Sequence, residues 1–323
     1  MEIKTRFTQM VGCKLPVVIA PMFLVSNPDM VVAGCESGAL GTFPALNIRP
    51  VEKLRDWLKE IQSKTQKPYG VNIIVNKSNQ HAQKQIEICL EEKVTFFIAS
   101  LGNPKELIQK AHQIGSKVFC DVINQEQAKK AVDVGADGLI AVCAGAGGHA
   151  GNISPFVLIP MLRNMFSLPI LASGCVVHGR SLAACLTLGA DGVLMGTRFI
   201  ASKECPVATE YKEAIVNARP EDIVTTYKLD GIAANVINTP YVKKTGTQLS
   251  LWERLLFRYP KLRKWIMAQR AWRSMPVLMQ SIQKPTWKQL WGAGQSVGLI
   301  HSIQSTSEIL ETLYKEYQET LPG

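Results

Sequence analysis

Short apolar runs rich in branched side chains recur along roughly the first 200 positions of the chain, and segments with helical spacing separate them. Each run is apolar throughout, which is typical of parallel strands that are covered on both faces. Several of the intervening segments end on glycine, a common helix stop. The pattern predicts strands at 15–21, 39–45, 69–75, 95–100, 117–122, 138–143, 169–174 and 192–197.

Eight strand–helix units in about 200 residues predict an α/β fold, a closed (β/α)8 TIM barrel. The alternative is a doubly wound open sheet, which would normally carry a glycine-rich dinucleotide fingerprint after its first strand. Here the first strand leads into "APMFLVSNPD" instead. The barrel is therefore favoured.

The pattern changes after residue 204. Residues 209–218 have helical spacing, residues 224–242 are irregular, and the basic, aromatic stretch from 251 to 280 is predicted to be helical. We predict three parts: a barrel domain over 1–204, a smaller, mainly helical cap over 205–289, and a C-terminal segment over 290–323 that packs back on the barrel.

The net charge of +10 comes from one part of the 323-residue chain. Residues 240–290 hold 11 Lys and Arg against the single acid Glu253, whereas the remaining 25 basic and 25 acidic residues cancel. An amphipathic cap helix with a solvated basic face explains the excess, because Lys and Arg stems cover apolar surface. The alternatives are attraction of an anionic substrate, an acidic protein or an anionic membrane surface. No nucleic-acid partner is expected.

The cysteine pattern points to a reduced, cytoplasmic protein without a metal site. Eight cysteines lie far apart, and no two form a CxxC pair. The 46% hydrophobic content supplies an ample core, yet no run of about 18 apolar residues predicts a membrane span. The N-terminus also lacks the apolar core of a secretory signal.

Candidate chemistry gathers where predicted strands end, because barrel enzymes carry their sites at the C-terminal ends of the strands. The stretch "CAGAGGHAG" after the sixth strand sets His149 among four glycines, which would let a ligand approach the backbone closely. Ser173-Gly174 and Gly196-Thr197 end the seventh and eighth strands, where barrels commonly bind phosphate. A flexible turn with an incidental histidine, and ordinary turn glycines, are the alternative explanations.

Six segments in the same order resemble the FMN-dependent nitronate monooxygenases, formerly called 2-nitropropane dioxygenases. They are "APMFLVSNPDMVVAGCESGALGTFPA", "YGVNIIVN", "GAGGHAG", "LPILASGCVVHGRSLAACLTLGADGVLMGTRF", "DGIAANVI" and "GAGQSVGLI". The resemblance covers about residues 13–300 and implies a TIM barrel, FMN at its mouth, a helical substrate cap and oxidation of nitronates by O₂.

The resemblance assigns residues by motif. It implies that His149 is the active-site histidine, acting as a base or as an electrostatic stabiliser. The implied FMN and phosphate contacts are Ala20, Pro21, Met22, Asn72, Gly147, Ser173, Gly174, Gly196 and Thr197. One departure is Val142-Cys143, since many relatives carry Gln near this strand end. A flavin contact made there in relatives is therefore not expected here.

Other interpretations remain open. Asn72 would equally satisfy backbone groups at a strand end, and Asp121 would equally cap a helix. His81, His112, His178 and His301 show no clustering and are expected to be surface or structural residues. Flavin-dependent enoyl-ACP reductases and quinone reductases, which use NAD(P)H, resemble the same pattern. A non-catalytic binding or membrane-associated barrel is the alternative from another class.

Overall fold

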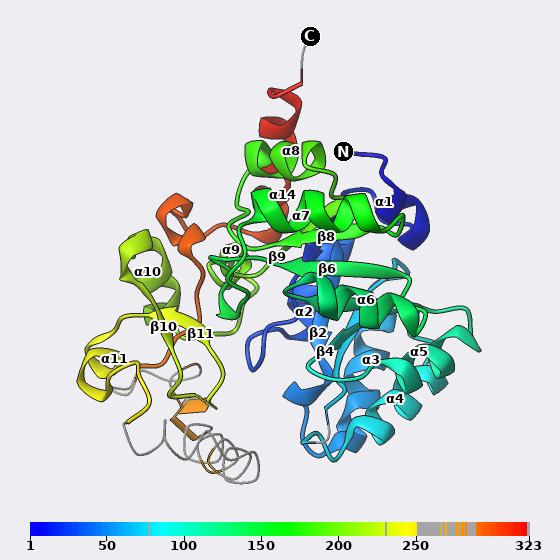
Figure 1. Ribbon diagram of the computed structural model, residues 1–323, viewed down its shortest axis with the longest axis horizontal. Helices are drawn as coiled ribbons and strands as arrows, with labels where there is room; N and C mark the ends of the chain where they lie inside the picture. The colour runs from blue at the N-terminus through cyan, green and yellow to red at the C-terminus, as the bar shows by residue number, and fades with distance from the viewer. Residues whose placement is uncertain are drawn as a thin grey trace.

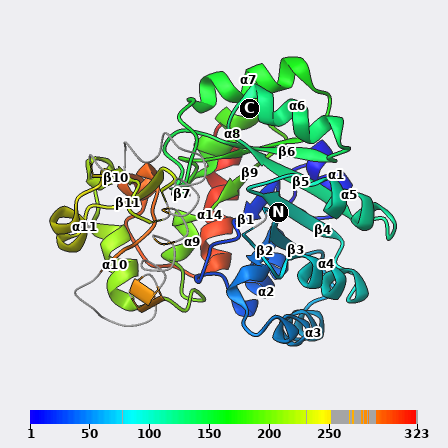
Figure 2. The same cartoon turned by 60° about the horizontal axis from the view of Figure 1, so that its bottom comes forward.

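The structure is a computed structural model that describes residues 1–76, 78–229, 231–250, 266, 269, 276–277, 279–280, 282 and 289–321. Its main element is a closed barrel of parallel strands (Figures 1 and 2). The strands, in order, are β1 (Val17–Ile19), β2 (Leu40–Pro44), β3 (Gly70–Ile74), β4 (Phe96–Ser100), β5 (Lys117–Val122), β6 (Gly138–Val142), β8 (Ile170–Ser173) and β9 (Gly192–Met195). All eight predicted strands are confirmed. Because β1 also pairs with β9, the sheet has no edge and the open-sheet alternative is excluded.

Helices follow the strands and surround the barrel, as Figure 2 shows. They are α2 (Pro28–Glu36), α3 (Leu54–Lys64), α4 (Ala82–Glu91), α5 (Lys105–His112), α6 (Gln125–Asp133), α7 (Pro155–Met165), α8 (Gly179–Thr187) and α9 (Thr197–Ile200). Side-chain caps fix several starts: Asn27 accepts from the Met30 N–H before α2, and Asn124 accepts from the Gln127 N–H before α6.

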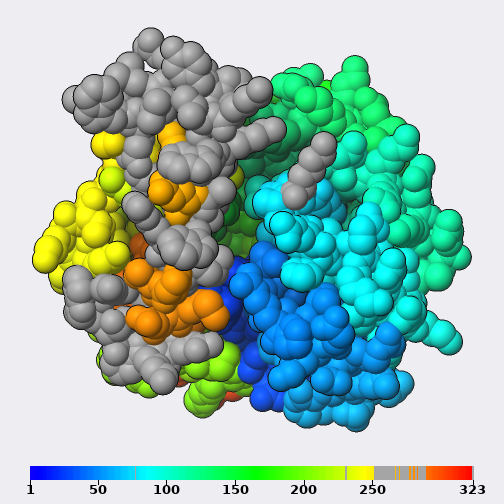
Figure 3. Space-filling view, turned by 90° about the horizontal axis from the view of Figure 1, so that it is seen from below, coloured from blue at the N-terminus to red at the C-terminus, as the bar shows by residue number. Residues whose placement is uncertain are grey.

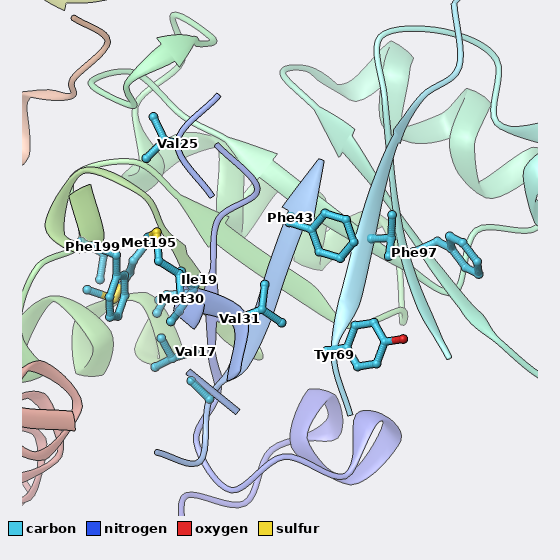
Figure 4. Packing of buried hydrophobic residues seen from close by; sticks show 14 of the residues in the cluster. Val17, Ile19, Val25, Met30, Val31, Phe43, Tyr69, Phe97, Met195 and Phe199 are labelled. Atoms are coloured by element: carbon cyan, nitrogen blue, oxygen red, sulfur yellow. The ribbon is translucent and has the colours of Figure 1, made fainter. Parts of the chain in front are cut away.

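Two hydrophobic clusters hold the barrel. The larger lies between the strands and the surrounding helices, where Ile19 of β1 meets Met30 and Val31 of α2 (Figure 4). The smaller cluster joins strand residues to Phe7 of α1 (Arg6–Val11), a helix that precedes the first strand. The Phe7 ring meets the Phe96 and Phe119 rings edge-on at centroid distances of 6.1 and 5.8 Å. The Phe7 ring therefore helps to anchor α1 to the barrel.

Residues 205–289, the predicted cap, contain a sheet as well as helices. Its described part holds α10 (Thr209–Asn217) and α11 (Pro240–Thr245), together with β10 (Ile223–Thr226) and β11 (Ala234–Ile237). The prediction that 224–242 is irregular is therefore wrong. These strands are short, and pairing with another segment stabilises them: β11 pairs antiparallel with β10 and with β7 (Gly148–His149). The predicted helix over 251–280 lies largely outside the described residues.

The chain returns to the barrel after the cap. Ser202 forms a parallel bridge with Gln304, and the Lys203 N–H donates to the Gln304 carbonyl at 2.9 Å. The final helix α14 (Thr306–Gln318) then contacts both α8 and α2, so it packs beside them on the outside of the barrel. Short 3₁₀ turns complete the structure at Ala45–Asn47, Val51–Lys53, Pro220–Asp222 and Gln295–Leu299. Within the described ranges, every helix is too short or too polar to cross a bilayer.

Candidate functional site

A cavity of about 1090 Å³ lies between the C-terminal ends of the barrel strands and the cap. In the space-filling view, a hollow separates the blue and cyan barrel surface from the yellow and orange surface of the cap (Figure 3). The structure brings every sequence-predicted site residue to this one lining: Ala20, Pro21, Met22, Asn72, Gly147, His149, Ser173, Gly174, Gly196 and Thr197. The cavity volume lies just above the usual range for small-molecule sites.

The loop after β1 is held in place by two polar side chains that the sequence analysis did not single out. The Met22 N–H donates to Ser26 Oγ at 2.9 Å, and the Ser26 hydroxyl donates to the Ala20 carbonyl at 3.3 Å. The amide of Asn47 donates to the carbonyls of Met22 and Ser26. The Ala20–Met22 turn is therefore preorganised at the edge of the cavity.

Three polar side chains on neighbouring strands form a chain of hydrogen bonds across the barrel mouth. The Asn72 amide on β3 donates to the Ile98 carbonyl at 3.0 Å and to Ser100 Oγ at 2.7 Å. Ser100, which ends β4, donates in turn to the carboxylate of Asp121 on β5. Both Asn72 amide hydrogens are thus used within the protein, as the backbone-satisfying interpretation expects. Among the described residues, no donor reaches its Oδ1, which remains available at the cavity.

Asp121 is not a helix cap. Asn124 performs that role for α6, and the Asp121 carboxyl lines the cavity instead. Burial raises the pKa of this carboxyl to about 6, although the hydrogen bond from Ser100 opposes the shift by stabilising the ionised form. The cavity therefore contains a carboxyl group that changes charge near neutral pH.

The glycine loop after β6 packs against the loop at 292–296. A Cβ on Gly147 would lie 2.8 Å from the backbone nitrogen of Gly294, so the close approach of the two backbones requires glycine. The Gly294 N–H donates to Thr197 Oγ1 at 3.0 Å, and Asn235 of β11 donates to the Ala146 carbonyl at 2.7 Å. Asn235 was not singled out from the sequence, because its role depends on a contact between distant segments.

The ends of β8 and β9 provide hydroxyl and backbone groups to the same cavity. Ser173 and Thr197 are each 7% exposed, and Gly174 follows with φ of +114°, a conformation that favours glycine. Cys175, also on the lining, has φ of +61°. Thr197 Oγ1 accepts from the Gly294 N–H, and among the described residues no acceptor takes its hydroxyl hydrogen, which is available to a ligand.

His149 lies at the junction of barrel and cap. It belongs to β7 and stands opposite Ala234 of β11, so the antiparallel sheet fixes its backbone beside the cavity. Apolar residues of the cap, including Leu229, Ile232 and Val236, line the cavity near this sheet. A ligand would therefore meet polar strand ends on the barrel side, and an apolar surface with one imidazole on the cap side.

The remaining histidines lie away from the cavity lining. His112 pairs with Asp137 at 2.8 Å, and His178 Nδ1 lies 3.1 Å from Ser181 Oγ. Val142 lines the cavity, whereas Cys143 is buried with its Sγ 3.3 Å from the Ala141 carbonyl. In the described part of the chain, no three His, Cys, Asp or Glu side chains converge as metal ligands would. All eight cysteines are described, and all are free thiols.

A family model described as nitronate monooxygenase matches residues 4–85 and 76–316 of this chain. A carboxyl-CoA dehydrogenase of Mycobacterium tuberculosis, acting on a methyl-oxo-octahydroindene compound, is 27% identical over 97% of this chain and 96% of its own. A probable nitronate monooxygenase of Staphylococcus aureus is 27% identical over 75% of this chain and 80% of its own.

Solved structures share the whole architecture. FabK from Thermotoga maritima is similar with a TM-score of 0.87 and 32% identity, over 98% of this chain and 97% of its own. A nitroalkane oxidase from Streptomyces ansochromogenes has a TM-score of 0.78 at 22% identity, over 97% of this chain and 98% of its own, which supports the fold alone.

Proposed function

Because the chain belongs to the nitronate monooxygenase family and is an oxidoreductase, we propose that it binds FMN at the barrel mouth and oxidises alkyl nitronates with O₂. The observation that carries this proposal is the convergence of ten residues, chosen from separate motifs, on one cavity. The small-molecule substrate would lie between the cofactor and the apolar residues of the cap.

The cavity residues suit a flavin mononucleotide. Gly147, Gly174 and Gly196 leave backbone groups accessible, and the hydroxyls of Ser173 and Thr197 are donors of the kind that a phosphate needs. At the other strand ends, Asn72 Oδ1 and the Asp121 carboxyl face the cavity as partners for the polar edge of a ring. When bound, the flavin supplies the two-electron chemistry, while the protein supplies position and electrostatics.

His149 can serve in either of two roles. As imidazolium it stabilises an anionic nitronate by charge. As neutral imidazole it removes the α-proton from a nitroalkane. The sheet formed by β7, β11 and β10 holds the residue in place, and the apolar residues of the cap exclude water from the ligand.

The test mixes purified protein with a small alkyl nitronate under anaerobic conditions and follows the visible flavin band. Parallel cuvettes contain NADH, NADPH or buffer. We expect bleaching by the nitronate alone and recovery of the band on admission of air. A flavin band that is bleached only by NADH or NADPH would contradict nitronate oxidation.

A second candidate is NAD(P)H-dependent chemistry on an acyl thioester or a quinone. This candidate is supported by the similarity of this chain, over almost its full length, to a dehydrogenase named for a carboxyl-CoA compound. The cavity is also larger than a small nitronate requires. Adding crotonyl-CoA or a quinone to the NAD(P)H-reduced protein distinguishes the two candidates, because reoxidation without air would support the second.

A further inference from the structure

The proposed function places the Asp121 carboxyl on the cavity lining beside the ring but gives it no part in the redox reaction. Hydrogen bonds join the Asp121 carboxyl on β5 to Ser100 of β4, and Ser100 to Asn72 of β3. These three strands are neighbours in the barrel, so its sheet holds all three side chains in place. The Ser100 hydroxyl donates its hydrogen bond to one Asp121 carboxylate oxygen, and the same hydroxyl oxygen accepts from the Asn72 amide. The hydrogen-bond directions therefore hold the carboxyl in one orientation.

The position of Asp121 separates it from the phosphate donors. Ser173 lies on β8 and Thr197 follows β9 as the first residue of α9, whereas Asn72, Ser100 and Asp121 lie on β3, β4 and β5 in the same closed barrel. A phosphate bound at the ends of β8 and β9 would leave the ends of β3, β4 and β5 to contact the ring of the cofactor. Flavin rings have a polar edge with two carbonyls and an N–H between them, and this edge becomes negatively charged on reduction.

Resting on the proposed function, we propose that Asp121 hydrogen-bonds the polar edge of the flavin ring and takes up a proton from solvent when the ring is reduced, with Ser100 and Asn72 as positioning residues. The substrate supplies two electrons, the ring gains one proton and one net negative charge, and the Asp121 carboxylate gains a second proton. The neutral carboxyl then donates a hydrogen bond to the negative edge instead of repelling it.

The groups around Asp121 allow its carboxylate to take up a proton near neutral pH. Burial already raises the pKa of the Asp121 carboxyl to about 6, and a negative charge beside it would raise the pKa further. The other titratable groups on the lining are Lys130 and Asp133 of α6, His149 of β7, Tyr211 of α10, and Cys120 and Cys175. Lys130 is paired with Glu126 at 2.6 Å, and burial keeps both cysteines and Tyr211 protonated by raising their pKa values.

The experiment measures the midpoint potential of the FMN-loaded protein against pH, for the wild type and for Asp121→Asn. Each proton taken up changes the reduction equilibrium tenfold per pH unit, which is about 30 mV for a two-electron couple. Above pH 6 we expect a hundredfold change per pH unit in the wild type, and a tenfold change in Asp121→Asn. Below about pH 5 the two slopes should converge, because Asp121 is then protonated in both redox states.

Two further variants sharpen the test. Asp133→Asn makes the same chemical change on α6 at the edge of the cavity and should keep the wild-type slope. Ser100→Ala removes the hydrogen bond that favours the carboxylate, so the pH at which the slope changes should move upward. If Asp121→Asn does not fold, the Ser100→Ala measurement tests the proposal instead.

Different failures point to different conclusions. If FMN binds and Asp121→Asn keeps the wild-type slope, the proton uptake by Asp121 is wrong while the proposed function stands. If the wild type binds no FMN, the proposed function and this inference fall together. An infrared carboxylic-acid band of the apoprotein that titrates near pH 6 and disappears in Asp121→Asn would support the assignment independently of the cofactor.

Discussion

At the scale of single residues, the two sides of the cavity contribute different chemistry. His149 is held on the cap side by a two-residue strand, whereas the Asn72, Ser100 and Asp121 side chains are held on the barrel side by long, paired strands. We therefore expect that His149 can be replaced without disturbing the barrel. Asn72, Ser100 and Asp121 are joined by hydrogen bonds, so replacing one of them affects the position of the others.

Replacing His149 by Asn should slow flavin reduction by about 10²–10⁴-fold, the usual contribution of a positioned acid–base group. FMN should remain bound, because the proposed phosphate donors, Ser173 on β8 and Thr197 at the start of α9, are left unchanged. Anaerobic stopped-flow absorbance gives the reduction rate, and the visible spectrum gives occupancy. Loss of the cofactor would identify His149 as a structural residue.

Gly147→Ala should destabilise the protein by about 1–3 kcal/mol, because the added Cβ would meet the Gly294 backbone at 2.8 Å. Urea denaturation measures the free energy of unfolding. Gly292→Ala is a matched control in the facing loop, since its Cβ would meet no atom closer than 4.0 Å. Equal effects of the two substitutions would argue against the steric explanation.

The raised pKa of Asp121 predicts a specific pH dependence of stability. Between about pH 4 and 6 the folded protein binds a proton that the unfolded chain has lost, so stability falls as pH rises through this window. This loss is about 3 kcal/mol, and Asp121→Asn should not show it. Urea denaturation at pH 4 and pH 7 should therefore give a stability difference between the two proteins that grows with pH. A constant difference would contradict a raised pKa.

At the scale of elements, the helix α1 is fixed to the barrel from two sides. Phe7 packs against the strand interior, while Arg6 Nε lies 2.7 Å from Asp191 Oδ1. Asp191 also accepts from Arg163 of α7 at 3.0 Å and from the Ile170 N–H at 2.8 Å. A six-residue helix is marginal by itself, so these contacts stabilise it.

Phe7→Ala should lower the free energy of unfolding by about 3–5 kcal/mol, since it removes a fully buried aromatic side chain. Gln9→Ala, an exposed change on the same helix, should have little effect. Chemical denaturation of both variants gives the comparison. A small loss in Phe7→Ala would mean that the helix can leave the barrel without consequence.

The elements differ in how well the sequence predicts them. Barrel strands were predictable because each is a continuous apolar run, and the motifs at their ends could be assigned to one rim. The helix α1 and the strands β10 and β11 were missed, because they are too short to show a period and depend on distant partners. The link from Asn72 through Ser100 to Asp121 was missed because it follows from strand register, which periodicity does not fix.

At the scale of the whole molecule, the cavity joins segments that span most of the chain, from Ala20 to Ser296. A ligand that contacts all of them ties the barrel to the cap. Binding to the folded state alone stabilises it by mass action.

FMN at a hundredfold excess over its Kd should therefore raise the free energy of unfolding by about 2.7 kcal/mol. Thermal denaturation with and without added FMN detects the change as a higher Tm. Riboflavin, which lacks the phosphate, is the control and should stabilise less at equal concentration. Equal shifts for the two compounds would contradict a phosphate site at β8 and β9.

The bridge between Ser202 and Gln304 has a consequence for the divergence of such enzymes. Residues 203–303 form an insertion whose two ends are already joined on the barrel, so mutations within it need not shift any barrel strand or α14. Descendants of one ancestor can then inherit an unchanged barrel mouth while selection alters the insertion. Lineages that act on different substrates should differ most in the parts of this insertion outside the 230–237 and 292–300 motifs, and least along the strands.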